Sequence, residues 1–260
     1  MMSNFKIAFF DIDGTLAAHN AGDESSILDR IPDTTRLALK ELKENGIEPV
    51  IATGRNRGMI SDLLKDLKID SYIANNGRFV SFKGKTIMHD VFSAEQLKMA
   101  VSQLNDQGIP FCYETADVLY KNKSSKFIGD SSMFVKTIPD DKVPEDVIQL
   151  IIKLNNQKEQ LNFNVPEIKT VKVAKLVYDV TLKGSNKAVG IKKILESTGV
   201  SAKDTIAFGD EENDLEMFDA VGYTVAMGNA NPIVKNRADF ITTDVNNDGI
   251  KNAVEELQLI

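Results

Sequence analysis

The chain of 260 residues has one cysteine, two histidines and no tryptophan. A single cysteine excludes an intramolecular disulfide framework, and one cysteine with two histidines cannot complete a Cys/His zinc site within one chain. The longest uncharged stretch, residues 220–234, is broken by glycine, asparagine and proline, so no run reaches the roughly 18–20 apolar residues of a membrane span. We therefore expect no membrane partner, and a reducing, cytoplasmic setting suits the low cysteine content.

Positive charge is also in short supply. The chain has 31 Lys and Arg residues against 38 Asp and Glu residues, a formal net charge of −7. This balance argues against a nucleic acid as the main partner, while an acidic protein can still hold a divalent cation. Residues 1–16 contain one basic residue and an apolar run of only four, so they do not read as a signal peptide.

Short apolar runs alternate with helical patterns at both ends of the chain. The expected strands are residues 6–10, 49–52, 72–74, 205–208, 223–227 and 239–241. Strands that alternate with helices in this way predict an α/β fold, a Rossmann-like doubly wound parallel sheet covered by helices on both faces. We expect this domain to comprise residues 1–83 and 184–260.

Residues 84–183 have a different character. Longer helical patterns, at residues 94–104 and 145–154, are combined with alternating strand patterns. This stretch contains as many lysines as acidic residues, so the net negative charge of the chain comes from the rest. We predict an inserted α+β domain here.

Two acidic motifs follow expected strands. Asp11-Ile12-Asp13-Gly-Thr comes directly after residues 6–10, at the kind of strand end where open α/β sheets bind ligands. Its alternative explanation is a turn rich in Asp and Gly. Asp210 and Asp214 lie in a stretch, residues 209–214, where four of six residues are acidic. Helix capping would explain one or two of these acids but not all of them. Hard oxygen donors without His or Cys point to Mg²⁺.

Two weaker motifs accompany them. Thr53-Gly54-Arg55 ends the strand at residues 49–52, where a hydroxyl and free amides suit a phosphate oxygen, although Thr-Gly is also an ordinary turn. Lys187 stands at an expected helix start, and a lone lysine is more often a surface charge. Lysines 121, 123 and 126 read as a solvated cluster or as a site for a second anionic group of a substrate.

Taken together and in this order, the four motifs closely resemble the haloacid dehalogenase-like (HAD) hydrolase superfamily, and within it the Cof-type phosphatases. The resemblance covers residues 5–82 and 184–260 and includes the turn Asn75-Asn76-Gly77. Cof-type phosphatases carry a substrate-covering cap between the second and third motifs, and residues 84–183 lie at that position. The resemblance implies that this insertion is a cap that sets substrate specificity.

The chemistry of phosphoryl transfer gives the motifs their roles. Asp11 would attack phosphorus and form an aspartyl-phosphate, while Asp13 would protonate the leaving alkoxide and then activate water. The resemblance implies that Mg²⁺ is bound by Asp11, the Asp13 main-chain carbonyl and Asp210. It also implies that the phosphoryl oxygens are held by Thr53, Lys187, Asn213 and the amides of Ile12 and Gly54, with Asp214 orienting this set.

We therefore expect a Mg²⁺-dependent phosphatase for small phosphorylated metabolites: sugar phosphates, nucleotide or flavin-pathway phosphates, or pyridoxal phosphate. A phosphomutase and a phospho-aspartate signalling module are the alternatives. The inserted domain speaks against the signalling module, which needs no cap. Asp244 to Glu255 matches the written EF-hand calcium pattern, but a strand pattern precedes it where an EF-hand has a helix. No role is assigned to His19 or Cys112, and the oligomeric state cannot be read from the sequence.

Overall fold

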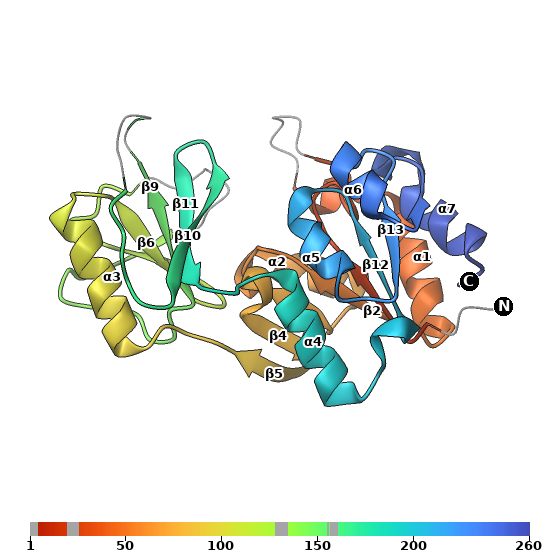
Figure 1. The fold of residues 1–260 in the computed structure, drawn as a ribbon, viewed down its shortest axis with the longest axis horizontal. Coiled ribbons are helices and arrows are strands. Elements are labelled where there is room, and N and C mark those ends of the chain that lie inside the picture. The colour runs from red at the N-terminus through yellow and green to blue at the C-terminus, as the bar shows by residue number, and fades with distance from the viewer. Residues whose placement is uncertain (1–4, 20–25, 128–134, 155, 157–160) are drawn as a thin grey trace. The chain divides into compact units, whose positions relative to one another are not determined.

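The computed structural model describes residues 5–19, 26–127, 135–154, 156 and 161–260. The chain forms two compact units (Figure 1). The first, here called the core unit, comprises Met1–Arg55, Ile60–His89 and Asn186–Ile260; the second, called the inserted unit, comprises Asn56–Met59 and Asp90–Ser185. The insertion predicted from the sequence begins at residue 84, but residues 85–89 form a strand of the core unit's sheet. The junction therefore lies a few residues later in the structure.

An eight-stranded sheet forms the centre of the core unit, in the order β14-β13-β12-β1-β2-β3-β4-β5. Six strands run parallel: β1 (Ile7–Phe10), β2 (Glu48–Ala52), β3 (Tyr72–Ala74), β12 (Thr205–Gly209), β13 (Tyr223–Ala226) and β14 (Phe240–Ile241). At one end of the sheet, β4 (Phe79–Phe82) pairs antiparallel with β3, and the edge strand β5 (Lys85–His89) pairs antiparallel with β4. The mixed α/β fold with a parallel sheet is thus confirmed.

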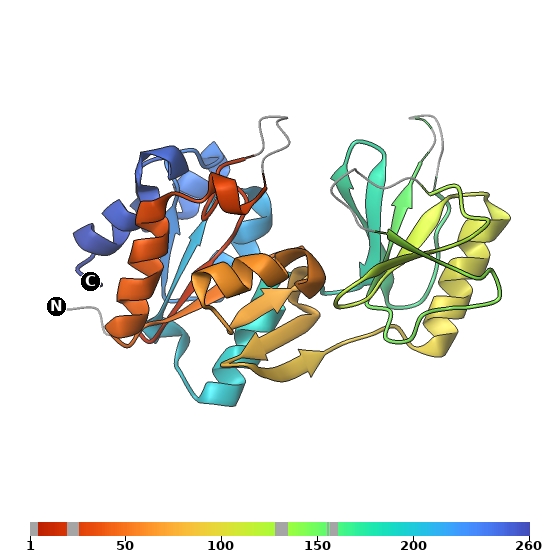
Figure 2. The same cartoon turned by 180° about the vertical axis from the view of Figure 1, so that it is seen from behind.

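Helices cover both faces of this sheet. They are α1 (Asp33–Glu44), α2 (Arg57–Leu67), α4 (Lys187–Thr198), α5 (Leu215–Phe218), α6 (Pro232–Arg237) and α7 (Gly249–Glu256). Helices α1 and α7 lie side by side on one face, and α4 and α5 pack together on the other (Figures 1 and 2). Helix α1 buries Thr35, Ala38, Leu39 and Leu42, the spacing that keeps one helical face against a sheet.

The middle of the sheet is the apolar core. All four residues of β1 are buried, because a central parallel strand is covered on both faces and reads as an unbroken apolar run. Phe10 stacks on Phe208 of β12 with ring centroids 4.6 Å apart. Helix α4 approaches closely because Gly190 has no side chain: a Cβ there would lie 2.4 Å from Cγ2 of Ile73 on β3. Within the described residues, no helix is both long and apolar enough to cross a membrane.

The inserted unit has its own sheet of six strands, in the order β10-β11-β9-β6-β7-β8. The strands are β6 (Phe111–Glu114), β7 (Leu119–Asn122), β8 (Val135–Ile138), β9 (Gln149–Lys153), β10 (Ile168–Ala174) and β11 (Val177–Leu182), and the helix is α3 (Ala94–Asp106). Ser93 begins α3 with a capping box in which Ser93 and Gln96 bond each other's backbone amides. Leu104 of α3 packs with Phe111 and Leu150 in one apolar cluster.

The prediction of a helix over residues 145–154 is wrong. The structure forms β9 there, and its residues pair antiparallel with β6 and β11. Ile151 and Ile152 are β-branched and fully or nearly fully buried, and a short apolar run of this kind suits a buried strand as well as a helix. Pairing with two neighbours decides the outcome, because it satisfies the backbone of β9 on both edges.

Polar groups are buried in the inserted unit's sheet. Gln149 on β9 donates from Nε2 to Oε2 of Glu114 on β6 at 2.7 Å, and both side chains are almost fully buried. Burial raises the pKa of Asp179 on β11 to about 7, although a hydrogen bond from Gln149 opposes the shift. Burial also raises the pKa of the Cys112 thiol, so this cysteine is an inert core residue.

Replacing Asp179 with asparagine is expected to stabilise the protein in a pH-dependent way. With a pKa near 7 in the folded state and 3.8 as the unfolded value, the folded state keeps a proton that the unfolded state loses. Wild-type stability therefore falls as pH rises between these values, by an upper limit of about 4 kcal/mol. Thermal melts at pH 5 and pH 8 should show a larger gain for Asp179→Asn at pH 8. The exposed control Asp141→Asn should show none, and an equal gain for Asp179→Asn at both pH values would contradict the account.

Candidate active site

The four sequence motifs converge at the carboxyl ends of the central strands of the core sheet. β1, β2 and β12 are parallel neighbours, so the residues that follow each strand emerge together at their carboxyl ends. Asp11 follows β1, Thr53 follows β2 and Asp210 follows β12. Strand β1 lies between β2 on one side and β12 on the other, so the strand order changes direction at β1. The carboxyl end of β1 is therefore a topological switch point, where open α/β sheets bind ligands.

A buried lysine joins two of the aspartates. Nζ of Lys187 lies 2.5 Å from Oδ1 of Asp11 and 2.6 Å from Oδ1 of Asp214, and Lys187 is only 1% exposed. Lys187 is the first residue of α4, whose N-cap Asn186 accepts a hydrogen bond from the Val189 amide. Helix start and side chain are therefore fixed together. The lysine that sequence alone could read as a surface charge lies at the centre of the cluster.

Burial and charge oppose each other in this cluster. Burial raises the pKa of Asp11 to about 7, the ammonium of Lys187 opposes that rise, and the charge of Asp214 adds to it. Burial alone would lower the pKa of Lys187, but the two carboxylates outweigh burial and raise it. Lys187 therefore stays charged across the physiological range, and the Asp11 carboxyl needs further positive charge to ionise fully.

Asp210 is 1% exposed and has a partner for each carboxylate oxygen. Oδ1 accepts from the hydroxyl of Thr15 at 3.0 Å, and Oδ2 lies 2.9 Å from Nε2 of His19. Burial raises the pKa of Asp210 to about 6, the charge of Asp214 adds to this, and the Thr15 bond opposes it. Asp214 in turn accepts the amide of Asp210 at 2.9 Å, so the loop after β12 holds the acids in fixed positions.

The donor set fits a divalent cation. Asp11, Asp210 and Asp214 are all buried, and one oxygen from each lies within 4.8 Å of the others. Three carboxylates against the single ammonium of Lys187 give a formal charge of −2. Carboxylate oxygens of this kind are ligands that Mg²⁺ prefers.

Asp13 lies outside this cluster and is held by arginines. Arg55 donates from Nε to Oδ2 at 2.9 Å and from Nη2 to Oδ1 at 3.0 Å, a bidentate pair. Arg30 lies 3.9 Å from Asp13 Oδ1. Arg55 belongs to a motif that the sequence shows, but its pairing with Asp13 and the approach of Arg30 cannot be predicted, because a pairing between loops has no sequence signal.

A tight turn supports the loop after β2. Thr53 accepts the Arg55 amide on its hydroxyl at 3.2 Å, and its carbonyl accepts the amide of Asn76 at 3.2 Å. Gly77 has φ +87°, and a Cβ there would lie 2.2 Å from the carbonyl oxygen of Asn186, the N-cap of α4. The turn that contains Asn76 and Gly77 thus braces both the Thr53 loop and the helix that carries Lys187.

The other predicted phosphate-binding groups are placed as follows. Ile12 is buried directly after Asp11, and its carbonyl accepts amides of the following loop, including Ala17 at 2.8 Å. Gly54 lies close to the side chain of Asn76, since a Cβ at residue 54 would be 3.0 Å from Oδ1 of Asn76, which is tighter than an ordinary contact. Asn213 is exposed on the short turn Glu212–Asp214, and among the described residues it forms no side-chain hydrogen bond with the buried cluster.

Comparisons with known proteins show which family the chain resembles. The sequence profile of haloacid dehalogenase-like hydrolases matches residues 8–254. Putative phosphatase YkrA of Bacillus subtilis is 34% identical over 98% of both chains. The 5-amino-6-(5-phospho-D-ribitylamino)uracil phosphatase YcsE of the same organism is 28% identical over 96% of this chain and 95% of its own. The solved structure of the HAD subclass IIB sugar phosphatase BT4131 is 28% identical, covers 98% of this chain and all of its own, and has a TM-score of 0.76.

Proposed function

Since the chain belongs to the haloacid dehalogenase-like hydrolase family and is a phosphatase, we propose that it hydrolyses phosphomonoesters of small metabolites with Mg²⁺, through an aspartyl-phosphate on Asp11. The observation that carries this proposal is the buried group of Asp11, Lys187, Asp210 and Asp214. A carboxylate beside a fixed ammonium, at the ligand-binding edge of the sheet, is suited to attack phosphorus.

Asp11 is the nucleophile in this proposal. One of its carboxylate oxygens forms a bond to phosphorus while the bond from phosphorus to the leaving oxygen breaks. The ammonium of Lys187, 2.5 Å from Asp11, offsets the repulsion between carboxylate and phosphate. Asp214 keeps Lys187 in place at 2.6 Å. Mg²⁺ held by Asp11, Asp210 and the Asp13 main-chain carbonyl would supply further positive charge on the phosphoryl oxygens.

Asp13 carries the protons. It gives a proton to the leaving alkoxide, then takes one from the water that attacks the aspartyl-phosphate, which releases phosphate and restores Asp11. Arg55 bonds both carboxylate oxygens of Asp13, at 2.9 and 3.0 Å, so this pair has to open before the side chain can give or take a proton. The phosphoryl oxygens are held by the side chains of Thr53, Lys187 and Asn213 and by the amides of Ile12 and Gly54.

The substrate belongs to the small phosphorylated metabolites. Sugar phosphates, flavin-pathway or nucleotide phosphates and pyridoxal phosphate are the candidates, and the names of BT4131 and YcsE support the first two classes. We assign the choice among them to the inserted unit, which would act as the cap. Nucleic acid is not proposed as a substrate, because the chain's net charge of −7 would repel it. The single, buried cysteine suits a cytoplasmic setting.

A panel of phosphorylated metabolites tests this function. With Mg²⁺, we expect free phosphate to be released, the ranking of kcat/KM to name the substrate class, and a chelator to abolish release. Analysis of the organic product separates the alternatives, since a phosphomutase would isomerise a sugar phosphate without releasing phosphate. A long-lived acyl phosphate with no turnover would instead indicate a signalling module.

A further inference from the structure

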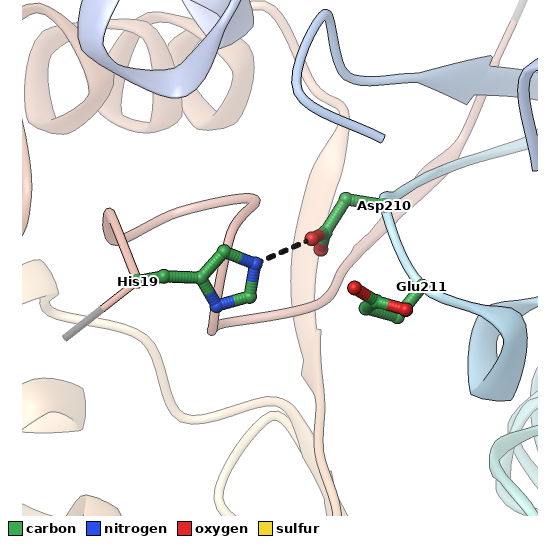
Figure 3. A group of neighbouring side chains, drawn as sticks. All are labelled: His19, Asp210 and Glu211. Carbon is green, nitrogen blue, oxygen red and sulfur yellow. Dashed lines mark hydrogen bonds and ion pairs between the residues drawn. The ribbon is translucent and has the colours of Figure 1, made fainter. Parts of the chain in front are cut away.

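A histidine contacts the buried acid cluster from outside. His19 lies in the loop after β1, and its Nε2 is 2.9 Å from Oδ2 of Asp210 (Figure 3). The side chain of His19 is 54% exposed, whereas that of Asp210 is 1% exposed. The ring therefore connects solvent with a carboxylate that the proposed mechanism uses, and that mechanism gives the ring no role.

Glu211 completes a group of three. One ligand atom each from His19, Asp210 and Glu211 lies within 4.8 Å of the others, and Glu211 is exposed. Figure 3 shows the imidazole directed at the Asp210 carboxylate, with Glu211 next to it in the chain. The group is thus open to solvent on two sides and anchored by a buried carboxylate on the third.

The loop is shaped to admit the imidazole. Gly14 has φ +84°, and a Cβ at this position would lie 2.4 Å from Nε2 of His19 and 2.0 Å from Oδ2 of Asp210. Any side chain at residue 14 would therefore separate the two groups. The absence of a Cβ leaves the histidine and the aspartate in direct contact.

The donors of this group differ in kind from those of the buried cluster. Asp11, Asp210 and Asp214 offer oxygen alone, which suits Mg²⁺. His19, Asp210 and Glu211 offer one imidazole nitrogen and two carboxylates, a set typical of Zn²⁺ and Co²⁺ with water as a further ligand. Because Asp210 belongs to both groups, an ion at one of them changes what the other can bind.

We propose that His19, Asp210 and Glu211 form a second divalent-cation site, selective for ions of the Zn²⁺ and Co²⁺ type, which competes with the Mg²⁺ cluster for Asp210. An ion there would take Oδ2 of Asp210, which now contacts Nε2 of His19 directly at 2.9 Å, and this oxygen would no longer be available to the Mg²⁺ cluster. Micromolar Zn²⁺ would then inhibit the Mg²⁺-loaded enzyme. The inhibition rests on the proposed function, whereas the binding of Zn²⁺ does not.

The two histidines of the chain allow a direct test of binding. His89 lies on β5, where its ring packs edge-on against Phe79 with centroids 5.1 Å apart, and it serves as an internal control. In NMR spectra of the whole protein titrated with Zn²⁺, the His19 ring signals should shift and the His89 signals should not. His19→Gln should weaken Zn²⁺ binding, measured calorimetrically, by about 10- to 100-fold and leave Mg²⁺ binding unchanged.

Two further variants sharpen the result. Glu211→Gln should also weaken Zn²⁺ binding, and His89→Gln should not. Equal Zn²⁺ affinity in wild type and His19→Gln, or no Zn²⁺ binding at micromolar concentration, would overturn the proposal. Failure of the phosphatase proposal would leave the NMR and calorimetric results intact, so the two can be told apart. If phosphatase activity is present, Zn²⁺ inhibition should be relieved in His19→Gln.

Discussion

Replacing Asp11 with asparagine should lower phosphatase turnover by about 10⁴-fold or more while the protein remains folded. The amide is not a nucleophile toward phosphorus, and Asp214 cannot take its place, since Asp214 is fully buried and bonded to Lys187. The aspartate and asparagine side chains have nearly the same shape, so the substitution at residue 11 should not disturb the packing. Lys187 also keeps its bond to Asp214 in the variant, so its charge remains paired.

The measurement is phosphate release under single-turnover conditions, together with circular dichroism and a thermal melt. Asp62→Asn is the matched control, because this aspartate lies exposed on α2, where it pairs with Lys65 at 3.0 Å. It should keep wild-type activity. Turnover of Asp11→Asn within tenfold of wild type would show that another group attacks phosphorus, and the mechanism would be wrong.

Replacing Lys187 with methionine should reduce both stability and turnover. Methionine fills a similar volume but leaves Asp11 and Asp214 facing each other, buried and without their shared cation. Removing one partner of a buried ion pair costs about 3–5 kcal/mol. Turnover should fall by about 10²- to 10³-fold or more, the usual cost of losing one electrostatic group that stabilises a transition state.

Urea unfolding and initial rates measure these two effects. Lys192→Met on the exposed face of α4 is the control for the helix and should change neither quantity. If Lys187→Met does not fold, Lys187→Gln, which keeps a hydrogen-bond donor, allows the rate to be measured. Wild-type stability and rate in both variants would show that Lys187 is a surface charge without a role.

The sequence predicts the core sheet well because burial there is complete. A central parallel strand such as β1 is apolar on both faces, so it appears as an unbroken run, and the motif that follows marks its carboxyl end. The same logic brings Asp11 and Asp210 together, since β1 and β12 are parallel neighbours. The roles assigned to these residues remain predictions.

The inserted unit and the loops were harder to predict. A short apolar run such as residues 149–153 suits a helix or a strand, and only its pairing with β6 and β11 decides. Strand β5 begins with Lys85, ends with His89 and has no fully buried residue. Its sequence therefore does not indicate that it belongs to the core sheet. Contacts between loops, such as Arg55 with Asp13, depend on backbone paths that no residue pattern specifies.

His19 shows the same limit at the site itself. Its distance from Asp11 along the chain gives no sign that its ring reaches Asp210, which is 191 residues away in sequence. The contact depends on the backbone conformation at Gly14, with φ +84°, and on the space left by its missing Cβ. A glycine in an acidic loop has many explanations, so sequence reasoning could not single out this one.

The stereochemical course at phosphorus tests the central claim most directly. Attack by Asp11 and then by water makes two in-line displacements, and each inverts the configuration at phosphorus. The account therefore predicts net retention when a phosphorothioate monoester, made chiral at phosphorus with sulfur and two oxygen isotopes, is hydrolysed with Mg²⁺ in water that carries the third oxygen isotope. Net inversion would mean that water attacks the substrate in a single step, and it would contradict an aspartyl-phosphate on Asp11.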